Sequence, residues 1–396
     1  MPTEKTFGYS TKCVHAGTDP DPTWGSIVTP IYQTTTYAIM PSTVEELLKR
    51  YNGTKEAYTY TSTGNPTQRA AELKIAALEE GEDAIVFSSG MAAITSTLTS
   101  LVSAGDEIIA SRDIYGETYL FFTEVLANMG IKTHFFDALD VSQAEEFITD
   151  RTKVIYFETP TNPTLKLTDV SQVVQLAKTH QLTSMIDNTF ASPYNQNPRS
   201  MGVDLVAQSG TKYLAGHHAV VCGAVVGDKE RLDAVRHIRS LLGGILDPFG
   251  AFLLLHGVQT MSLRVERQNS NALMMAQILD DHPKILKTHY PGLDSHPQHE
   301  LAKKQMRGFG GMLAFELKGG LDAVKTFVEH LKIVRLATSL GGVDTTLTIP
   351  TFTTHGELNR EEQERIGVTQ GLIRSSIGIE DFEDLKQDFE HALSFV

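Results

Sequence analysis

The stretch VDLVAQSGTKYLAGHH, residues 203–218, joins a short apolar run to a lysine set among small and hydroxylated residues. The run VDLVAQS is followed by glycine and has the length typical of a buried strand. Lys212 comes next, with Ser209 and Thr211 nearby. Most lysines are solvated surface residues, but a lysine in a partly apolar pocket loses its proton more easily and becomes a nucleophile. We therefore expect a strand with a candidate nucleophilic lysine at its carboxyl end.

The sequence on both sides of this stretch alternates short apolar runs with helical segments. Further candidate strands are AIVF (84–87), EIIAS (107–111), KVIYFE (153–158), TSMID (183–187) and AVVCGAVVG (219–227). The segments at 91–102 and 170–181 have the apolar spacing of helices packed on a sheet. Repeated strand-helix units predict an α/β fold with a mostly parallel sheet, in which ligands bind at the carboxyl ends of the strands.

The length of 396 residues exceeds what one hydrophobic core usually supports, which predicts more than one domain. Residues 1–60 are rich in Thr, Pro, Gly and Tyr and predict an N-terminal arm. Residues 61–260 carry the strand-helix units and predict a large ligand-binding domain. Residues 261–396 combine a long helix at 264–282 with strands and an amphipathic tail, which predicts a smaller α+β C-terminal domain.

The composition bears on the classes of partner. Acidic residues outnumber basic ones by 48 to 34, and the net charge of -14 opposes binding to phosphate backbones and anionic lipid. We expect no nucleic-acid or membrane partner, since the sequence has no apolar run of about 18 residues, the length of a spanning helix. Cys13 and Cys222 are too few for a disulfide framework or a metal cluster. Because the N-terminus lacks a secretory pattern, we expect a cytoplasmic protein without a bound metal.

Three further motifs place polar residues after candidate strands. FSSGMAAI (87–94) runs through Ser-Ser-Gly into a helix and offers free N–H groups to phosphate, although many such turns are only helix caps. Asp187 ends an apolar strand, where a protonated pyridine nitrogen would pair with its charge; the alternative is a turn or capping aspartate. Asn162 could bond a ring hydroxyl or form an Asx turn.

The order of motifs along nearly the whole chain resembles a known family. The motifs are GNPT, SSGMAA, IYGET, ETPTNPT, IDNTF, SGTKY, YPGL, SLGG and IRSSIGIED. They resemble those of the Cys/Met-metabolism pyridoxal-phosphate enzymes, of the methionine γ-lyase and cystathionine γ-lyase type. The resemblance implies the type I aminotransferase-like fold and pyridoxal 5'-phosphate as cofactor. It also implies a homotetramer, a dimer of dimers with shared active sites.

The resemblance also implies roles for the residues that contact the cofactor. Lys212 would hold it as a Schiff base and remove the substrate's α proton. Asp187 would pair with the pyridine nitrogen, and Tyr115 would stack on the ring and assist proton transfer. The phosphate would be held by Gly90, Met91, Ser209 and Thr211.

Three residues are implied as ligands of the substrate carboxylate and of the cofactor hydroxyl region: Asn162, Ser339 and Arg374. Arg374 suits this role because a planar guanidinium binds a carboxylate through two parallel hydrogen bonds. The alternative for Arg374 is a structural ion pair.

The sequence departs from the family pattern at the phosphate clamp. The family has Tyr-x-Arg before the GNPT turn, whereas this chain has Tyr60 and then Ser62. Loss of a charge-assisted hydrogen bond to phosphate costs about 1.5 to 3 kcal/mol. We expect weaker cofactor retention, or a compensating cation such as Lys55 or Arg69.

Two further departures lie where the family reads the substrate side chain. Glu117 replaces a small residue or cysteine, and Thr338 stands where cystathionine-processing members carry glutamate. We hypothesise that Glu117 meets a distal cationic group on the substrate. In the loop after the lysine, His218 is also unusual, and its simpler interpretation is an altered loop.

The function implied is γ-elimination from a γ-substituted L-amino acid, such as methionine or cystathionine, with release of a 2-oxo acid and ammonia. The motif SLGG and the stretch at 243–257 resemble those of the lyases, and the stretch at 243–257 is also similar to that of the sulfhydrylases. One alternative is γ-replacement on an O-acylhomoserine. Another is a non-catalytic paralogue with weakened cofactor binding.

Overall fold

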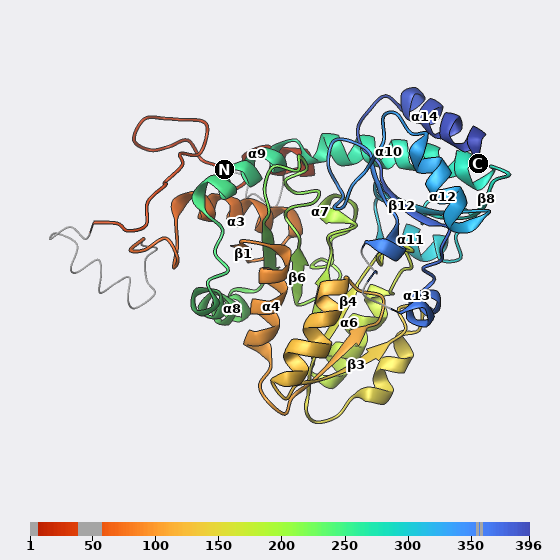
Figure 1. Ribbon diagram of the computed structural model, residues 1–396. Coiled ribbons are helices and arrows are strands. Elements are labelled where there is room, and N and C mark those ends of the chain that lie inside the picture. Colours follow the sequence, from red (N-terminus) through yellow and green to blue (C-terminus); the bar gives the residue numbers. More distant parts are fainter. Residues whose placement is uncertain (1–6, 39–57, 354–355, 357–358) are drawn as a thin grey trace.

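The larger of two sheets has seven strands in the order β1-β7-β6-β5-β4-β2-β3. The computed structural model describes residues 7–38, 58–353, 356 and 359–396 (Figure 1). The strands of this sheet are β1 (Asp83–Phe87), β2 (Glu107–Ser111), β3 (Lys132–Phe136), β4 (Thr152–Glu158), β5 (Thr183–Asp187), β6 (Leu205–Gln208) and β7 (Gly223–Gly227). Strands β3, β2, β4, β5 and β6 run parallel, and β7 is antiparallel to both its neighbours. The predicted mostly parallel α/β sheet is confirmed.

Helices cover both faces of this sheet because its strands bury side chains on both sides. On one face pack α3 (Pro66–Glu79), α6 (Val170–His180) and α9 (Pro248–Gln259). On the other pack α4 (Gly90–Leu101), η3 (Phe121–Leu126) and α8 (Lys229–Leu242). Successive strand residues alternate between the faces: Phe157 and Ile186 join the α3 side, and Tyr156 and Met185 join the α4 side.

The smaller sheet has five strands in the order β10-β11-β12-β9-β8. Its strands are β8 (Ile285–His289), β9 (Met312–Leu317), β10 (Arg335–Leu336), β11 (Thr346–Thr348) and β12 (Leu372–Ser376). The long helix expected at 264–282 is α10 (Met261–Asp280), and it packs on this sheet with α12 (Gly320–Glu329) and α14 (Phe382–Phe395). In Figure 1 this sheet and α14 lie at the C-terminal end of the molecule.

Shorter elements connect these layers. They are α1 (Tyr9–His15), α5 (Gly116–Leu120), η4 (Val141–Phe147), α7 (Ser192–Asn195), α11 (His299–Gln305), η5 (Pro350–Phe352) and α13 (Arg360–Ile366). Between α1 and α3, described residues near Trp24 extend away from the body (Figure 1), and Trp24 is 90% exposed. None of the helices in the described ranges is long and apolar enough to cross a bilayer.

Candidate active site

A cavity of about 630 Å³ lies at the carboxyl ends of β4, β5 and β6, between the larger sheet and residues of the smaller-sheet part of the chain. Twelve of the residues predicted for the site line it: Gly90, Met91, Tyr115, Glu117, Asn162, Asp187, Ser209, Thr211, Lys212, Thr338, Ser339 and Arg374. Tyr60 and Ser62 do not line it. The strand-end placement is the one expected for an open α/β sheet.

Lys212 lies in the turn four residues after the end of β6, and its Nζ donates a 2.7 Å hydrogen bond to the Ser339 hydroxyl. Burial, followed by the positive charge of Arg374, lowers the pKa of Lys212 to about 8, although Asp187 and Glu117 oppose the shift. A substantial fraction of this amine is therefore neutral near physiological pH, as a nucleophile requires.

Arg374 projects from β12 and is 2% exposed. Its Nη1 donates to Asn162 Oδ1 at 2.9 Å, and its Nη2 donates to the main-chain oxygen of Ser339 at 3.1 Å. Burial lowers its pKa to about 10, so the guanidinium stays protonated at neutral pH. No carboxylate in the described part of the chain forms an ion pair with it, which argues against a structural ion pair.

Asp187 is the last residue of β5 and accepts a 2.9 Å hydrogen bond from the Thr189 amide at Oδ1. Burial raises its pKa, although the Thr189 hydrogen bonds and the charge of Lys212 oppose this. Glu158 pairs with Asp187 in the register of β4 and β5, and burial followed by the charge of Asp187 raises its pKa well above the usual value. The neighbouring carboxyls of buried Glu158 and half-buried Asp187 favour a ligand that brings a positive charge to Asp187.

The N-terminus of α4 forms the anion-binding end of the cavity. The Ser89 hydroxyl caps the helix by accepting from Ala92 N, while the first-turn N–H groups of Gly90 and Met91 have no acceptor within the helix. A Cβ atom on Gly90 would lie 2.9 Å from Ser209 Cβ, so only glycine allows this close approach. The arrangement suits a phosphate.

The two hydroxyl residues beside Lys212 differ in their partners. Ser209 donates its amide to Thr189 Oγ1 at 2.8 Å. The Thr211 hydroxyl donates to the Cys222 main-chain oxygen at 3.1 Å and accepts from the Cys222 amide at 3.0 Å. Of the two hydroxyls, that of Thr211 is therefore already engaged by the backbone.

Tyr115 precedes α5, and its amide donates to Glu158 Oε1 at 2.9 Å. Burial, followed by a hydrogen bond with Glu117, raises the pKa of Tyr115, so its hydroxyl is neutral at physiological pH. Glu117 itself is exposed to the cavity.

Several cavity residues were not singled out from the sequence, among them Glu158, Thr189 and Phe190. The Phe190 ring lies 5.9 Å from the Arg374 guanidinium. Glu158 had a sequence signal that was missed, since it ends a candidate strand beside that of Asp187.

Lys55 and Arg69 are the two cations expected to compensate for the missing arginine of the phosphate clamp. Lys55 lies outside the described residues. Arg69 binds Glu72 and Asp83 and does not line the cavity, which counts against it as a compensating cation there. His218 pairs with Asp344 at 3.1 Å, and a Cβ on Gly342 would collide with its ring.

The polar groups that line the cavity fit a cofactor with a phosphate, a protonated ring nitrogen and an aldehyde, as pyridoxal phosphate has. The free N–H groups of α4 suit the phosphate, Asp187 suits the nitrogen and Lys212 suits the aldehyde. The buried Nε of Arg374 has no hydrogen-bond partner among the described residues, which leaves a donor for a substrate carboxylate.

A family model described as Cys/Met metabolism PLP-dependent enzyme matches residues 10–394. An L-methionine gamma-lyase of Fusobacterium nucleatum subsp. polymorphum is 42% identical over 98% of each chain. A cystathionine beta-lyase of Coxiella burnetii is 40% identical over 97% of each chain. The crystal structure of a cystathionine gamma-lyase from Lactobacillus plantarum, complexed with L-serine, is 39% identical and covers 98% of this chain and 99% of its own, with a TM-score of 0.92. The predicted fold class is confirmed.

Proposed function

Since the chain belongs to the Cys/Met-metabolism family of pyridoxal-phosphate-dependent enzymes, we propose that it is a carbon-sulfur lyase. Its reaction is γ-elimination from methionine, cystathionine or a related L-amino acid, with release of a 2-oxo acid and ammonia. The observation that carries the proposal is the contact between Lys212 and Ser339 beside Arg374, in one cavity. Relatives named methionine gamma-lyase and cystathionine lyase support elimination over replacement.

The site residues divide the work between cofactor and substrate. When bound, pyridoxal phosphate supplies an electron sink that acidifies the substrate's α carbon. Asp187 would keep the ring nitrogen protonated, and the amides of Gly90 and Met91 would hold the phosphate. Lys212 would hold the cofactor, and its lowered pKa suits its Nζ to take the substrate's α proton.

Three residues orient the substrate by its carboxylate. Arg374 is held by Asn162 and by the main chain of Ser339, so its position is fixed before substrate arrives. The Ser339 hydroxyl stands between this anchor and the Lys212 amine. Tyr115 keeps a neutral hydroxyl and can pass a proton at Oη between substrate and Lys212.

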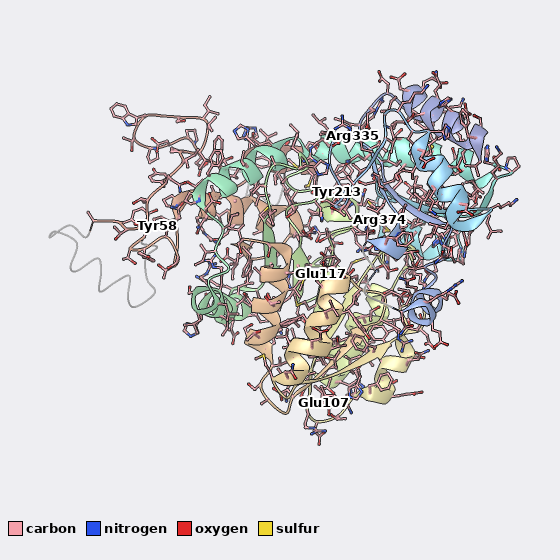
Figure 2. The ribbon with its side chains drawn as sticks, in the orientation of Figure 1. Tyr58, Glu107, Glu117, Tyr213, Arg335 and Arg374 are labelled. Atoms are coloured by element: carbon pink, nitrogen blue, oxygen red, sulfur yellow. The ribbon has the colours of Figure 1, made fainter. Side chains whose placement is uncertain are left out.

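Glu117 and Thr338 read the far end of the substrate. Glu117 comes from α5 on the larger sheet, whereas Arg374 comes from β12 of the smaller sheet (Figure 2). Both residues line the same cavity of about 630 Å³, so a substrate held by its carboxylate at Arg374 has room to extend toward Glu117. We infer that a distal ammonium, as in cystathionine, meets Glu117 while Thr338 contributes a neutral hydroxyl.

The arm proposed for residues 1–60 serves another copy of the chain in a cytoplasmic homotetramer. Tyr60 is 53% exposed and lies away from this chain's own cavity, which suits a role in a neighbouring cavity together with Ser62. Ile27, 85% exposed, would be covered by such an assembly.

The products distinguish the proposed reaction from its alternatives. Incubation with L-cystathionine should release 2-oxobutanoate, cysteine and ammonia, whereas β-elimination would release pyruvate and homocysteine. O-acylhomoserine with a thiol should give less replacement product than 2-oxobutanoate. If cystathionine gives pyruvate instead, or if neither compound gives 2-oxobutanoate although the enzyme carries cofactor, the proposal of γ-elimination is wrong.

A further inference from the structure

A buried polar network lies directly behind the cavity, on the α3 side of the larger sheet. Its centre is Glu79, the last residue of α3, whose side chain is fully buried at 0% exposure. Because strand residues alternate between faces, Asp187 points to the α4 side with the cavity, and Asn188 and Gln208 fall on the α3 side. The network and the cavity therefore share the same strand ends but occupy opposite faces.

One carboxylate oxygen of Glu79 receives two amide donors. Gln208 Nε2 donates to Glu79 Oε1 at 2.5 Å, and Asn188 Nδ2 donates to the same oxygen at 3.2 Å. Gln208 Nε2 also reaches the Asn188 main-chain oxygen at 3.3 Å. Glu79 thereby ties the end of β5 to the end of β6 from a helix more than a hundred residues earlier in the chain.

Gln196 extends the network to a third strand. Its Nε2 donates to Asn188 Oδ1 at 3.0 Å and to the main-chain oxygen of Thr159 at 3.2 Å. Its own main-chain oxygen accepts from Asn188 Nδ2 at 3.0 Å. Thr159 directly follows β4, so the ends of β4, β5 and β6 are all held.

Each network residue on a strand end is the chain neighbour of a cavity residue. Asn188 follows Asp187, and Gln208 precedes Ser209. A displacement of the backbone at Asn188 or Gln208 would move the adjacent cavity residue, because a planar peptide joins the two residues.

The surroundings of the Glu79 carboxyl disfavour its charged form. Burial raises the pKa of Glu79 to about 7, although the bonds from Gln208 and Asn188 and the charge of Arg307 oppose the shift. Glu80 also raises it. Glu79 Oε2 has no hydrogen-bond partner in the part of the chain that the structure describes. A group that is this unfavourable to bury, yet holds two amides, has a role that apolar packing would not supply.

We propose that Glu79 is a positioning residue for the cofactor site: by holding Asn188 and Gln208 it sets the placement of Asp187 and Ser209. This inference rests on the cofactor roles proposed above for Asp187 and Ser209. It extends the cofactor site to a residue that touches neither cofactor nor substrate.

The test uses apoenzyme and pyridoxal phosphate without any substrate. The dissociation constant of the cofactor and the visible circular dichroism of the bound form are measured for Glu79→Leu and Glu79→Gln. Glu72→Gln is the matched control, because Glu72 is a carboxyl on the same helix, 3% exposed, that binds Arg239 and the Val86 amide of β1 and, within the described ranges, makes no hydrogen bond to the ends of β4, β5 or β6.

Glu79→Leu should weaken cofactor binding about tenfold or more, the loss expected when displacement of Asp187 or Ser209 removes one hydrogen bond between the protein and a charged group of the cofactor. It should also change the dichroism. Glu79→Gln should rescue most of the affinity, since its amide oxygen can accept from both partners. Glu72→Gln should stay within about twofold of wild type even if its melting temperature falls.

Wild-type affinity and dichroism in Glu79→Leu would overturn the proposal, as would an affinity loss in Glu72→Gln equal to that in Glu79→Leu. If Glu79→Leu does not fold, Gln208→Met removes the same contact from the other side and is held to the same outcomes. A failed lyase assay would leave this result unaffected, because no substrate is used.

Discussion

The Nζ atom of Lys212 lies 2.7 Å from the Ser339 hydroxyl, and this hydrogen bond joins the two sheets at the cavity. Ser339 adopts a φ of 76°, in the left-handed region that disfavours residues with a side chain by roughly 1 to 2 kcal/mol. The strain places the hydroxyl toward Lys212 and the carbonyl toward Arg374. Backbone strain at Ser339, which contacts both Lys212 and Arg374, indicates a functional requirement for this conformation.

Two substitutions of Ser339 distinguish the effect of its hydroxyl on activity from the effect of its strained backbone on stability. Ser339→Ala and Ser339→Gly should both lower kcat/KM about tenfold, because both lose the contact to Lys212. Ser339→Gly should melt at a higher temperature than Ser339→Ala, since glycine tolerates the positive φ. Unchanged kcat/KM in both variants would exclude a role for the hydroxyl; Ser375→Ala, a buried serine outside the cavity, is the control.

Arg374→Lys should raise KM for the amino-acid substrate more than it lowers kcat. A lysine keeps the charge but loses the planar fork, and a loss of about 2 kcal/mol corresponds to roughly thirtyfold in affinity. Steady-state kinetics with methionine measures this. Arg267→Lys, at an exposed ion pair with Asp381, should leave KM unchanged. Equal KM values for Arg374→Lys and wild type would contradict the assignment.

The pKa of Lys212 sets the pH dependence of cofactor capture by apoenzyme. Only the neutral amine attacks an aldehyde, and burial lowers its pKa to about 8, so the capture rate should rise with pH and level off above about 8. In Arg374→Gln the midpoint should move upward, because the positive charge that lowers this pKa is gone. Stopped-flow absorbance gives the profile. A wild-type midpoint near 10 would show that the amine is not perturbed.

Glu117→Gln should reduce the preference for substrates with a distal ammonium. We expect the ratio of kcat/KM for cystathionine to that for methionine to fall about tenfold, because one opposite charge in the cavity is lost. Glu124→Gln, an exposed carboxyl on η3 outside the cavity, controls for net charge. A ratio equal to that of wild type would show that Glu117 does not recognise the distal group of the substrate.

Glu79 should make the stability of the apoenzyme depend on pH. Its folded-state pKa of about 7 lies above the ordinary 4.5, so its favourable contribution is complete below about pH 4.5 and is lost as pH rises through 7. Arg307 opposes the shift and Glu80 supports it. Between pH 5 and 8 the melting temperature of wild type should fall more than that of Glu79→Gln. Parallel changes in the two proteins would show that Glu79 does not titrate in this range.

The sequence was informative wherever a buried strand is apolar throughout. The six strands predicted for the larger sheet all occur, because both faces are covered and each reads as a short apolar run. The edge strand β3, with the sequence KTHFF, was missed because its residues are mixed and only Phe136 is buried.

The cavity could be predicted only in part. Asp187 and Lys212 follow apolar strands, so their type and position were informative. The Glu79 network was not predictable, because Glu79 meets Asn188 and Gln208 only after the sheet has formed, 109 and 129 residues away along the chain. Likewise, the contact of Arg374 with Asn162 spans 212 residues and depends on how the two sheets meet.

The central claim is that Lys212 carries the cofactor, and the most direct measurement is peptide mapping after borohydride reduction of the holoenzyme. Reduction fixes the cofactor to whichever lysine holds it, and mass spectrometry then identifies that residue. We predict one modified peptide, containing Lys212, and no visible absorbance in Lys212→Ala. A cofactor adduct on a different lysine, or unaltered absorbance in Lys212→Ala, would contradict the account.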